Sequence, residues 1–362
     1  MFGLQPVTPD LAPLIQNEDV RMLDLVGKMT PDGWLIAEKA AFPTDQTGGY
    51  FSSCFFVTKD GKRAFLKAFD IEKFDITQLP WLLSGFQYES DLLSLCKDKR
   101  LSRIVQILES GKIERDPNSP PVLRYVPFLV FELAEGDIRK TVDVSGTVTN
   151  QWRFFVLHQT TLALLQLHGQ SIAHQDLKPS NVLRFEASRL KLGDLGRSSF
   201  RGKAAPHDQE PCPGARNYAP FEQRYGHPPA DWVERRLSSD VFHLGCLVVF
   251  TFTNIVFPDY VMRQLALPYQ PLHWGASYEE VMPHIQASMA QSLHEIAPDF
   301  PEQFRAELME IVRDLCHPDP LLRGRANNKN KASVDLLWLQ KYASRFDILE
   351  KAARIRRPVT NA

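Results

Sequence analysis

Apolar and β-forming residues gather in short runs along the first third of the chain. From Trp34 onward the pattern is strand-like, and residues 54–57 and 62–69 flank a Lys-Asp-Gly turn, which predicts a hairpin. The runs IVQILESG and VPFLVFELA predict two further strands. Residues 79–97 instead place apolar side chains at helical spacing, which predicts a long helix. We therefore expect a small β-rich part that contains one helix.

Helical patterns dominate after Gly136. Residues 149–168 are amphipathic and predict a helix that ends at Gly169, and two short strands are expected at 181–185 and 189–196. The apolar-poor stretch that follows, residues 197–209, predicts a long surface loop. The run LGCLVVFTFTNIVF (residues 244–257) is too short to span a bilayer and contains Thr and Asn, so we interpret it as a buried core helix.

Composition narrows the class of protein further. The chain has 362 residues, 44% of them hydrophobic, and a net charge of -1, which is typical of a globular protein and gives no reason to expect nucleic-acid binding. Its five cysteines form no CxxC pair, so we expect reduced thiols and a cytoplasmic location rather than disulfides or a zinc site. The first twenty residues lack the basic and apolar regions of a signal peptide, and we expect no membrane span.

The stretch HQDLKPSN concentrates groups that can do chemistry. Asp176 can accept a proton or orient a hydroxyl, Lys178 lies on the same side of an extended loop, and Asn181 can ligate a hard cation through its amide oxygen. Asp194 ends a predicted strand thirteen residues later and could join Asn181 in holding one metal ion against phosphate oxygens. Taken alone, HQDLKPSN is also typical of an ordinary polar turn.

HQDLKPSN followed by DLG resembles the catalytic loop and the metal-binding segment of protein kinases. The resemblance implies an α+β, bilobal fold with a small antiparallel sheet and one helix in the N-lobe and a larger, mainly helical C-lobe. It implies four segments, namely an N-terminal extension (1–32), an ATP-binding N-lobe (33–134), a C-lobe (135–326) and a basic helical C-terminal extension (327–362).

The resemblance also assigns roles. Asp176 would be the catalytic base and Lys178 would stabilise the transferring phosphoryl group, while Asn181 and Asp194 would hold Mg²⁺, with Mn²⁺ as an alternative. Upstream, Lys67 would hold the phosphates of ATP and would be fixed by a helix glutamate, for which we choose Glu89 over its rival Glu72.

Two further segments are expected to bind the nucleotide. TGGYFSSC resembles the glycine-rich loop of the family, although Thr47 and Ser52 stand in place of two of its glycines. FELAEGDI resembles the hinge that joins the two lobes. Phe65 stands where the family usually has Ala over the adenine ring, and Phe131 would be the gatekeeper. The residues expected to contact the nucleotide in these segments are Thr47, Gly48, Gly49, Phe51, Cys54, Glu132, Ala134 and Asp137.

Three positions resemble structural residues of the family. Glu222, in GARNYAPFEQ, is expected to pair with Arg323, and Asp240 is expected to support the backbone of the catalytic loop. Two positions depart from the pattern, because Gln175 replaces an arginine that commonly binds a loop phosphate and Ala215 replaces a threonine that bridges the catalytic Asp and Lys. Arg197 is the candidate replacement cation, and Ser198 and Ser199 are candidate autophosphorylation sites.

The predicted function is that of a protein kinase that transfers the γ-phosphoryl group of ATP to Ser or Thr hydroxyls of a protein substrate, which could be the chain itself. Two alternatives stay open, a small-molecule phosphotransferase of similar fold and a pseudokinase scaffold that binds nucleotide without transfer. The last 40 residues hold ten Lys and Arg against three Asp and Glu. They could dock an acidic partner or a membrane surface, or residues 338–355 could pack as an amphipathic helix on the C-lobe.

Overall fold

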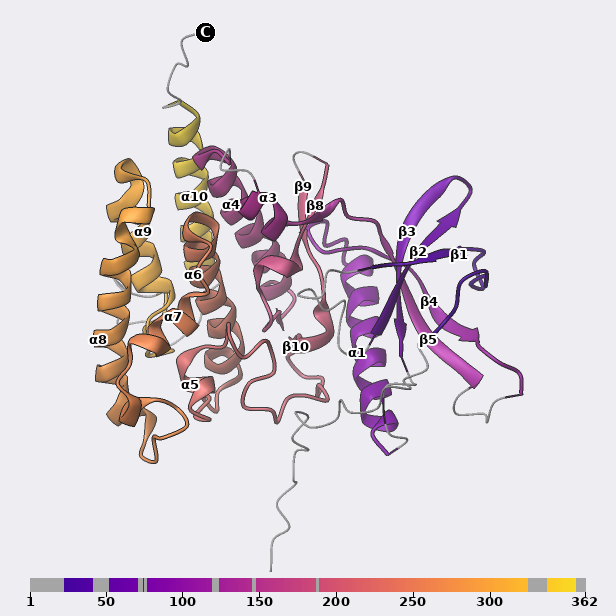
Figure 1. The fold of residues 1–362 in the computed structure, drawn as a ribbon, viewed down its shortest axis with the longest axis horizontal. Helices are drawn as coiled ribbons and strands as arrows, with labels where there is room; N and C mark the ends of the chain where they lie inside the picture. The colour runs from indigo at the N-terminus through magenta and orange to yellow at the C-terminus, as the bar shows by residue number, and fades with distance from the viewer. Residues whose placement is uncertain are drawn as a thin grey trace, which may run out of the picture. The chain divides into compact units, whose positions relative to one another are not determined.

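The computed structural model describes eight stretches of the chain, residues 23–41, 52–70, 74, 77–118, 124–144, 148–186, 189–324 and 337–355. The chain divides into two compact units (Figure 1). The first comprises Met1–Leu82 and Ser110–Val130, and the second comprises Leu83–Glu109 and Phe131–Ala362.

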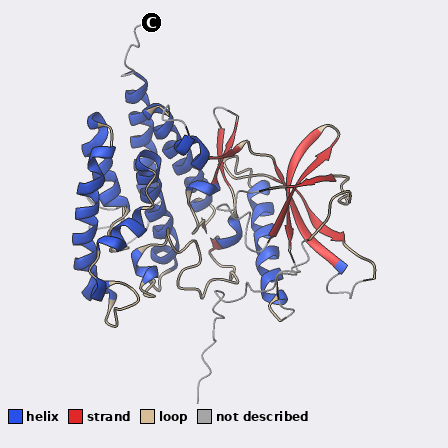
Figure 2. Ribbon diagram, in the orientation of Figure 1, coloured by secondary structure: helices blue, strands red, loops and turns tan. Residues whose placement is uncertain are grey.

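The N-terminal part of the chain forms a five-stranded sheet in the order β1-β2-β3-β5-β4 (Figure 2). Its strands are β1 (Leu35–Lys39), β2 (Ser52–Lys59), β3 (Lys62–Phe69), β4 (Ile107–Glu114) and β5 (Tyr125–Glu132). The antiparallel β2–β3 hairpin confirms the predicted one, and its register places Cys54 opposite Lys67. Asp60 and Gly61 both have positive φ (49° and 73°), as a two-residue hairpin turn requires.

The rest of the chain is mostly helical. The helices are α1 (Leu79–Asp98), α3 (Ile138–Val144), α4 (Asn150–His168), α5 (Phe221–Arg224), α6 (Ser238–Thr253), α7 (Phe257–Gln264), α8 (Tyr278–Ile296), α9 (Glu302–Leu315) and α10 (Leu337–Ile355). Short strands join them, namely β6 (Gly136–Asp137), β7 (Ile172–Ala173), β8 (Val182–Phe185), β9 (Arg189–Leu192) and β10 (Ser199–Phe200). The predicted long helices near residues 79–97 and 149–168 are both confirmed.

Helix α6 is the centre of the second unit, and every residue from Ser238 to Phe252 is buried. The prediction of one core helix over 244–257 is wrong at its end, because Asn254 adopts a left-handed conformation (φ 59°) that ends α6 and lets α7 start at Phe257. Asparagine tolerates this conformation better than most residues. In the described part of the chain no single helix is long and apolar enough to cross a membrane. The helical segments Val233–Thr253 and Phe257–Gln264, which meet at a bend of 91°, reach a sufficient length and apolar content only when they are taken together.

Helix α10 packs along α4, and the two lie side by side in Figure 1. Its buried face includes Leu339, Tyr342 and Phe346, and the Tyr342 hydroxyl bonds to Asp314 on α9. The basic segment near the C-terminus therefore uses an apolar helical face for packing, which was one of the two alternatives for it.

Candidate active site

The predicted catalytic residues of the second unit meet in one hydrogen-bonded cluster around Asp176. Lys178 Nζ lies 2.7 Å from Asp176 Oδ2, and Asn181 Nδ2 donates to the Asp176 carbonyl (2.8 Å) and to Oδ2 (3.2 Å). The remaining oxygen, Oδ1, accepts the backbone N–H of Ala215 at 2.8 Å. Asp176 is only 5% exposed, so these contacts fix its carboxylate within the loop that joins β7 to β8.

Asp240 holds the backbone of this loop, which confirms its predicted role. This fully buried carboxylate accepts the N–H groups of His174 and Gln175, both at 2.7 Å, and lies 2.8 Å from His168 Nε2. Burial raises the pKa of Asp240, but the hydrogen bond and charge of His168 outweigh that effect, and the pKa lies below its usual value. The support matters because Gln175 has a positive φ (61°), which a residue other than glycine seldom adopts.

The two residues expected to hold a metal are positioned by their backbones. The Asn181 carbonyl accepts the N–H of Gly193 at 3.0 Å, and Asp194 follows in a left-handed conformation (φ 59°). Asn181 Nδ2 donates to Asp176, so the atom that would ligate a metal is the amide oxygen Oδ1, which accepts the Ser180 hydroxyl at 3.3 Å. Carboxylate and amide oxygens fit Mg²⁺, which usually keeps water and phosphate oxygens in its remaining positions.

Glu89 lies beside the metal-binding segment. A Cβ atom added to Gly196 would lie 3.3 Å from Glu89 Oε2 and 3.4 Å from Asp194 Oδ1, so glycine leaves room for both carboxylates. Glu89 is 3% exposed on α1. Lys67 belongs to the first unit, where it is half-buried on β3, and its pairing with Glu89 stays a prediction.

The expected nucleotide-contacting residues are only partly described. Thr47, Gly48, Gly49 and Phe51, together with the rival glutamate Glu72, lie outside the described residues.

Among the hinge residues, the Glu132 side chain is engaged by Lys191 Nζ and by the N–H of Gln106 (2.7 Å). Asp137 binds the guanidinium of Arg139 at 2.8 and 3.0 Å. The roles of Cys54, Glu132, Ala134 and Asp137 toward a nucleotide stay predictions.

The predicted ion pair between Glu222 and Arg323 is confirmed. The guanidinium binds the carboxylate through two nitrogens, at 3.0 and 2.8 Å, and Arg323 is fully buried with Glu222 1% exposed. Arg323 also donates to the carbonyl of His317 (2.9 Å) and to Ser238 Oγ (3.2 Å). The pair ties the start of α5 to the chain that follows α9.

Arg236 was missed by the sequence interpretation. Its Nη1 donates to Gln175 Oε1 at 2.6 Å, and its Nη2 donates to the carbonyl and the carboxylate of Asp208 at 2.7 and 3.0 Å. Arg236 is 3% exposed, and burial lowers its pKa to about 10, so it stays charged at neutral pH. Arg236 precedes Asp240 by four residues, so helical spacing would have placed both side chains on the face that meets the catalytic loop.

Residues 197–214, which by the family resemblance form the activation segment, are held by two of their own carboxylates, Asp208 and Glu210. Arg197, the predicted replacement cation, pairs with Glu210 at 3.3 Å, while Gln175 Nε2 donates to the Arg197 carbonyl at 2.8 Å. Ser198 and Ser199 are fully buried and hydrogen-bonded, Ser199 to Asp208 Oδ1 at 3.1 Å. In this conformation neither serine is accessible for phosphorylation.

Replacing Arg236 by methionine should loosen the activation segment. The substitution removes the Arg236 hydrogen bonds to Gln175 and Asp208, although Asp208 keeps the Ser199 hydroxyl and the Ala205 amide as donors. Lost hydrogen bonds to charged groups cost about 1.5–3 kcal/mol each. Hydrogen–deuterium exchange should rise across residues 197–214, and urea unfolding should show the loss of stability. Arg216→Met, at an exposed position of the same segment, is the control. Unchanged exchange in Arg236→Met would show that the contacts of Arg236 do not hold the activation segment.

Gly214→Ala should separate the activation segment from the catalytic loop. A Cβ atom at Gly214 would lie 2.3 Å from the carbonyl oxygen of Gln175 and 3.1 Å from Asp176 Oδ1, so backbone must move. We expect a loss of about 1–3 kcal/mol, typical of overpacking, and faster exchange of the Ala215 amide. Gly275→Ala, where nothing lies within 4 Å, should change neither measurement. An unchanged Ala215 amide would contradict the contact.

Comparison with known proteins gives the family. The model of the protein kinase domain matches residues 48–332. The chain therefore belongs to the protein kinase family, and its antiparallel sheet followed by a mostly helical region is the α+β fold that the resemblance implied.

Similar curated proteins are plant mitogen-activated protein kinases. Mitogen-activated protein kinase 19 of Arabidopsis thaliana is 31% identical over 120 residues, which cover 32% of this chain and 20% of that protein. Mitogen-activated protein kinase 12 of Oryza sativa subsp. japonica is 29% identical over 118 residues, covering 32% and 20%, and Mitogen-activated protein kinase 17 of Arabidopsis thaliana is 30% identical over 118 residues, covering 32% and 24%. The aligned part is thus a fifth to a quarter of the length of these relatives.

Proposed function

We propose that the chain transfers the γ-phosphoryl group of ATP to Ser or Thr hydroxyls of protein substrates, with Mg²⁺ assistance. The observation that carries the proposal is the cluster in which Lys178, Asn181 and the Ala215 amide surround the carboxylate of Asp176. A fixed, nearly buried carboxylate beside a lysine provides a proton acceptor and a cation within one loop.

The proposed reaction is a direct displacement. The substrate oxygen forms a bond to the γ-phosphorus, the bond from that phosphorus to the β–γ bridging oxygen breaks, and ADP leaves with the bonding electrons. Asp176 orients the hydroxyl and accepts its proton, and Lys178 stabilises negative charge on the transferring group. Lys67, for which the family resemblance implies Glu89 as the partner, would hold the phosphates of ATP. A divalent ion held by Asn181 and Asp194 would neutralise phosphate charge.

Two features favour a protein hydroxyl as acceptor. A lysine two residues after the catalytic base, here Lys178, is typical of the Ser/Thr-directed members of the family. The backbone amide of Ala215 contacts Asp176, although Ala215 lacks the hydroxyl of the threonine that it replaces. The Glu222–Arg323 pair also holds an element that small-molecule phosphotransferases generally lack. A cytoplasmic location is part of the proposal, because the five cysteines, all within the described residues, form no disulfide.

Nucleotide binding and phosphate transfer, measured together, separate the alternatives. We expect ATP with Mg²⁺ to raise the melting temperature, EDTA to reduce that rise, and labelled phosphate to appear on Ser or Thr of peptides or of the chain itself. Stabilisation by ATP without transfer to peptides or small-molecule acceptors would instead identify a scaffold. Transfer only to small molecules would identify the other enzyme class.

A further inference from the structure

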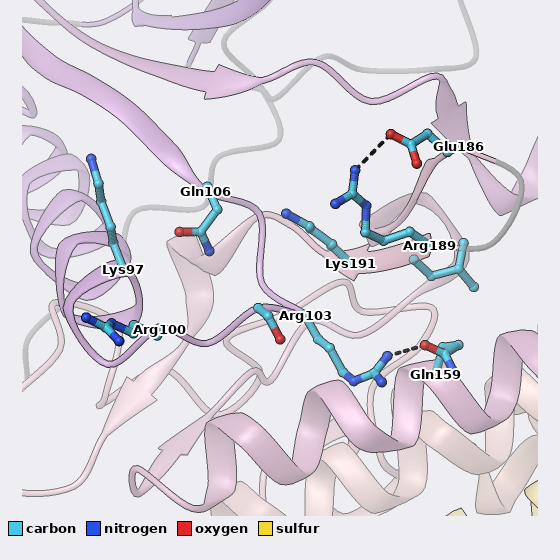
Figure 3. Close-up of a pocket in the computed structure, with 10 residues that line it drawn as sticks. Lys97, Arg100, Arg103, Gln106, Gln159, Glu186, Arg189 and Lys191 are labelled. Atoms are coloured by element: carbon cyan, nitrogen blue, oxygen red, sulfur yellow. Dashed lines mark hydrogen bonds and ion pairs between the residues drawn. The ribbon is translucent and has the colours of Figure 1, made fainter.

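A strongly basic pocket lies within the second unit. Its volume is about 610 Å³, and it is lined by five cations, the single anion Glu186, one apolar residue and three polar ones. The cations come from three elements, as Figure 3 shows: the end of α1, the loop that follows it, and β9. They are Lys97, Arg100, Arg103, Arg189 and Lys191.

Two of these cations are neutralised within the fold. Arg189 pairs with Glu186 at 3.0 Å, and Lys191 pairs with Glu132. For Lys97, Arg100 and Arg103, the described part of the chain supplies no carboxylate partner. Three positive charges around the pocket are therefore left for an external anion.

The loop that carries Arg103 is rigidly held. Its backbone N–H donates to Gln166 Oε1 (2.9 Å) and its carbonyl accepts the N–H of Leu192 (2.9 Å), so the loop is fixed between α4 and β9. The guanidinium itself donates to Gln159 on α4 (Figure 3). Gln159 is neutral, and burial lowers the pKa of Arg103, so an anion beside it would be stabilising. A fixed guanidinium loses little side-chain freedom when it binds.

We propose that this pocket binds a phosphorylated segment of a protein partner. Guanidinium, ammonium, hydroxyl and amide groups together match the oxygens of a phosphate monoester, and arginine binds phosphate with two parallel hydrogen bonds. Small-molecule pockets are mostly apolar and enclose their ligand, whereas this one has a single apolar lining residue, Leu190, and a widely exposed rim. A phosphorylated side chain presented on a larger molecule fits such an open, charged pocket.

Binding of a phosphorylated segment to this pocket does not require phosphate transfer by the chain, so it is measured separately from the kinase activity. A fluorescent pool of short degenerate peptides with a central phosphoserine is titrated with the full chain in the absence of ATP, beside the same pool with serine. We expect the phosphorylated pool to bind about tenfold or more tightly, and its binding to weaken as salt is added.

Matched variants locate the binding. Lys97→Gln/Arg100→Gln removes two exposed charges, and Arg103→Gln tests the anchored one; each should weaken binding of the phosphorylated pool about tenfold or more. Arg263→Gln/Arg313→Gln, which removes two exposed charges from α7 and α9, should leave binding unchanged. Equal binding of both pools, or equal losses in the control, would overturn the proposal. Binding of inositol hexakisphosphate at the pocket without binding of the phosphorylated pool would overturn it too.

Discussion

Asp176→Asn is expected to slow phosphate transfer by about 10²–10⁴-fold, the range that a positioned general base contributes. The neutral amide cannot accept the proton of the substrate hydroxyl. It has a similar size, but its single oxygen can accept either from Lys178 or from the Ala215 amide and not from both. Initial rates with saturating ATP measure the effect, and the melting temperature checks the fold.

Asp299→Asn is the matched control, because the same chemical change at an exposed carboxylate should leave the rate unaltered. Lys178→Met should also lower the rate, since it removes the cation on the other side of the cluster. A folded Asp176→Asn chain that transfers phosphate at the wild-type rate would remove Asp176 from the mechanism.

Arg323→Met is expected to lower the free energy of unfolding by about 3–5 kcal/mol, the cost of breaking a buried pair by removing one partner. Glu222 would remain buried with its charge uncompensated, and Ser238 Oγ would lose a donor. Urea unfolding measures the difference, and Arg313→Met at an exposed position of α9 is the control.

The double variant Glu222→Gln/Arg323→Met separates charge from shape. Removing the carboxylate's charge should recover part of the lost stability, so the two substitutions should not add. Additive losses, or a loss below about 1 kcal/mol in Arg323→Met, would show that the ion pair contributes little despite its burial.

Local spacing predicted the catalytic loop well, because Asp176, Lys178 and Asn181 lie within six residues and a turn must bring them together. Asp240 and the Glu222–Arg323 pair are distant in sequence, and only the family resemblance connected them. The break between α6 and α7 was missed although Asn254 carried a signal, because the apolar run on both sides outweighed one residue.

Arg236 was missed although its spacing of four residues from Asp240 carried a signal, and no such spacing indicates the basic pocket. In the sequence, Arg236 looks like a solvent-exposed charge in a polar stretch. Its side chain is buried because Asp208 and Gln175, which are distant in sequence, both accept its hydrogen bonds. In the sequence, Lys97 and Arg100 likewise look like charged residues at the solvent-exposed end of a helix. Only the three-dimensional placement of β9 and α4 beside Arg103 gathers these cations into one pocket.

Transfer of labelled phosphate from Mg²⁺-ATP to degenerate Ser, Thr and Tyr peptides, by the wild-type chain and by Asp176→Asn side by side, tests the proposed kinase activity most directly. We expect wild-type transfer to Ser and Thr peptides, little to Tyr peptides, and almost none by the variant. A folded wild-type chain that binds ATP and labels neither the peptides nor itself would contradict the proposed function.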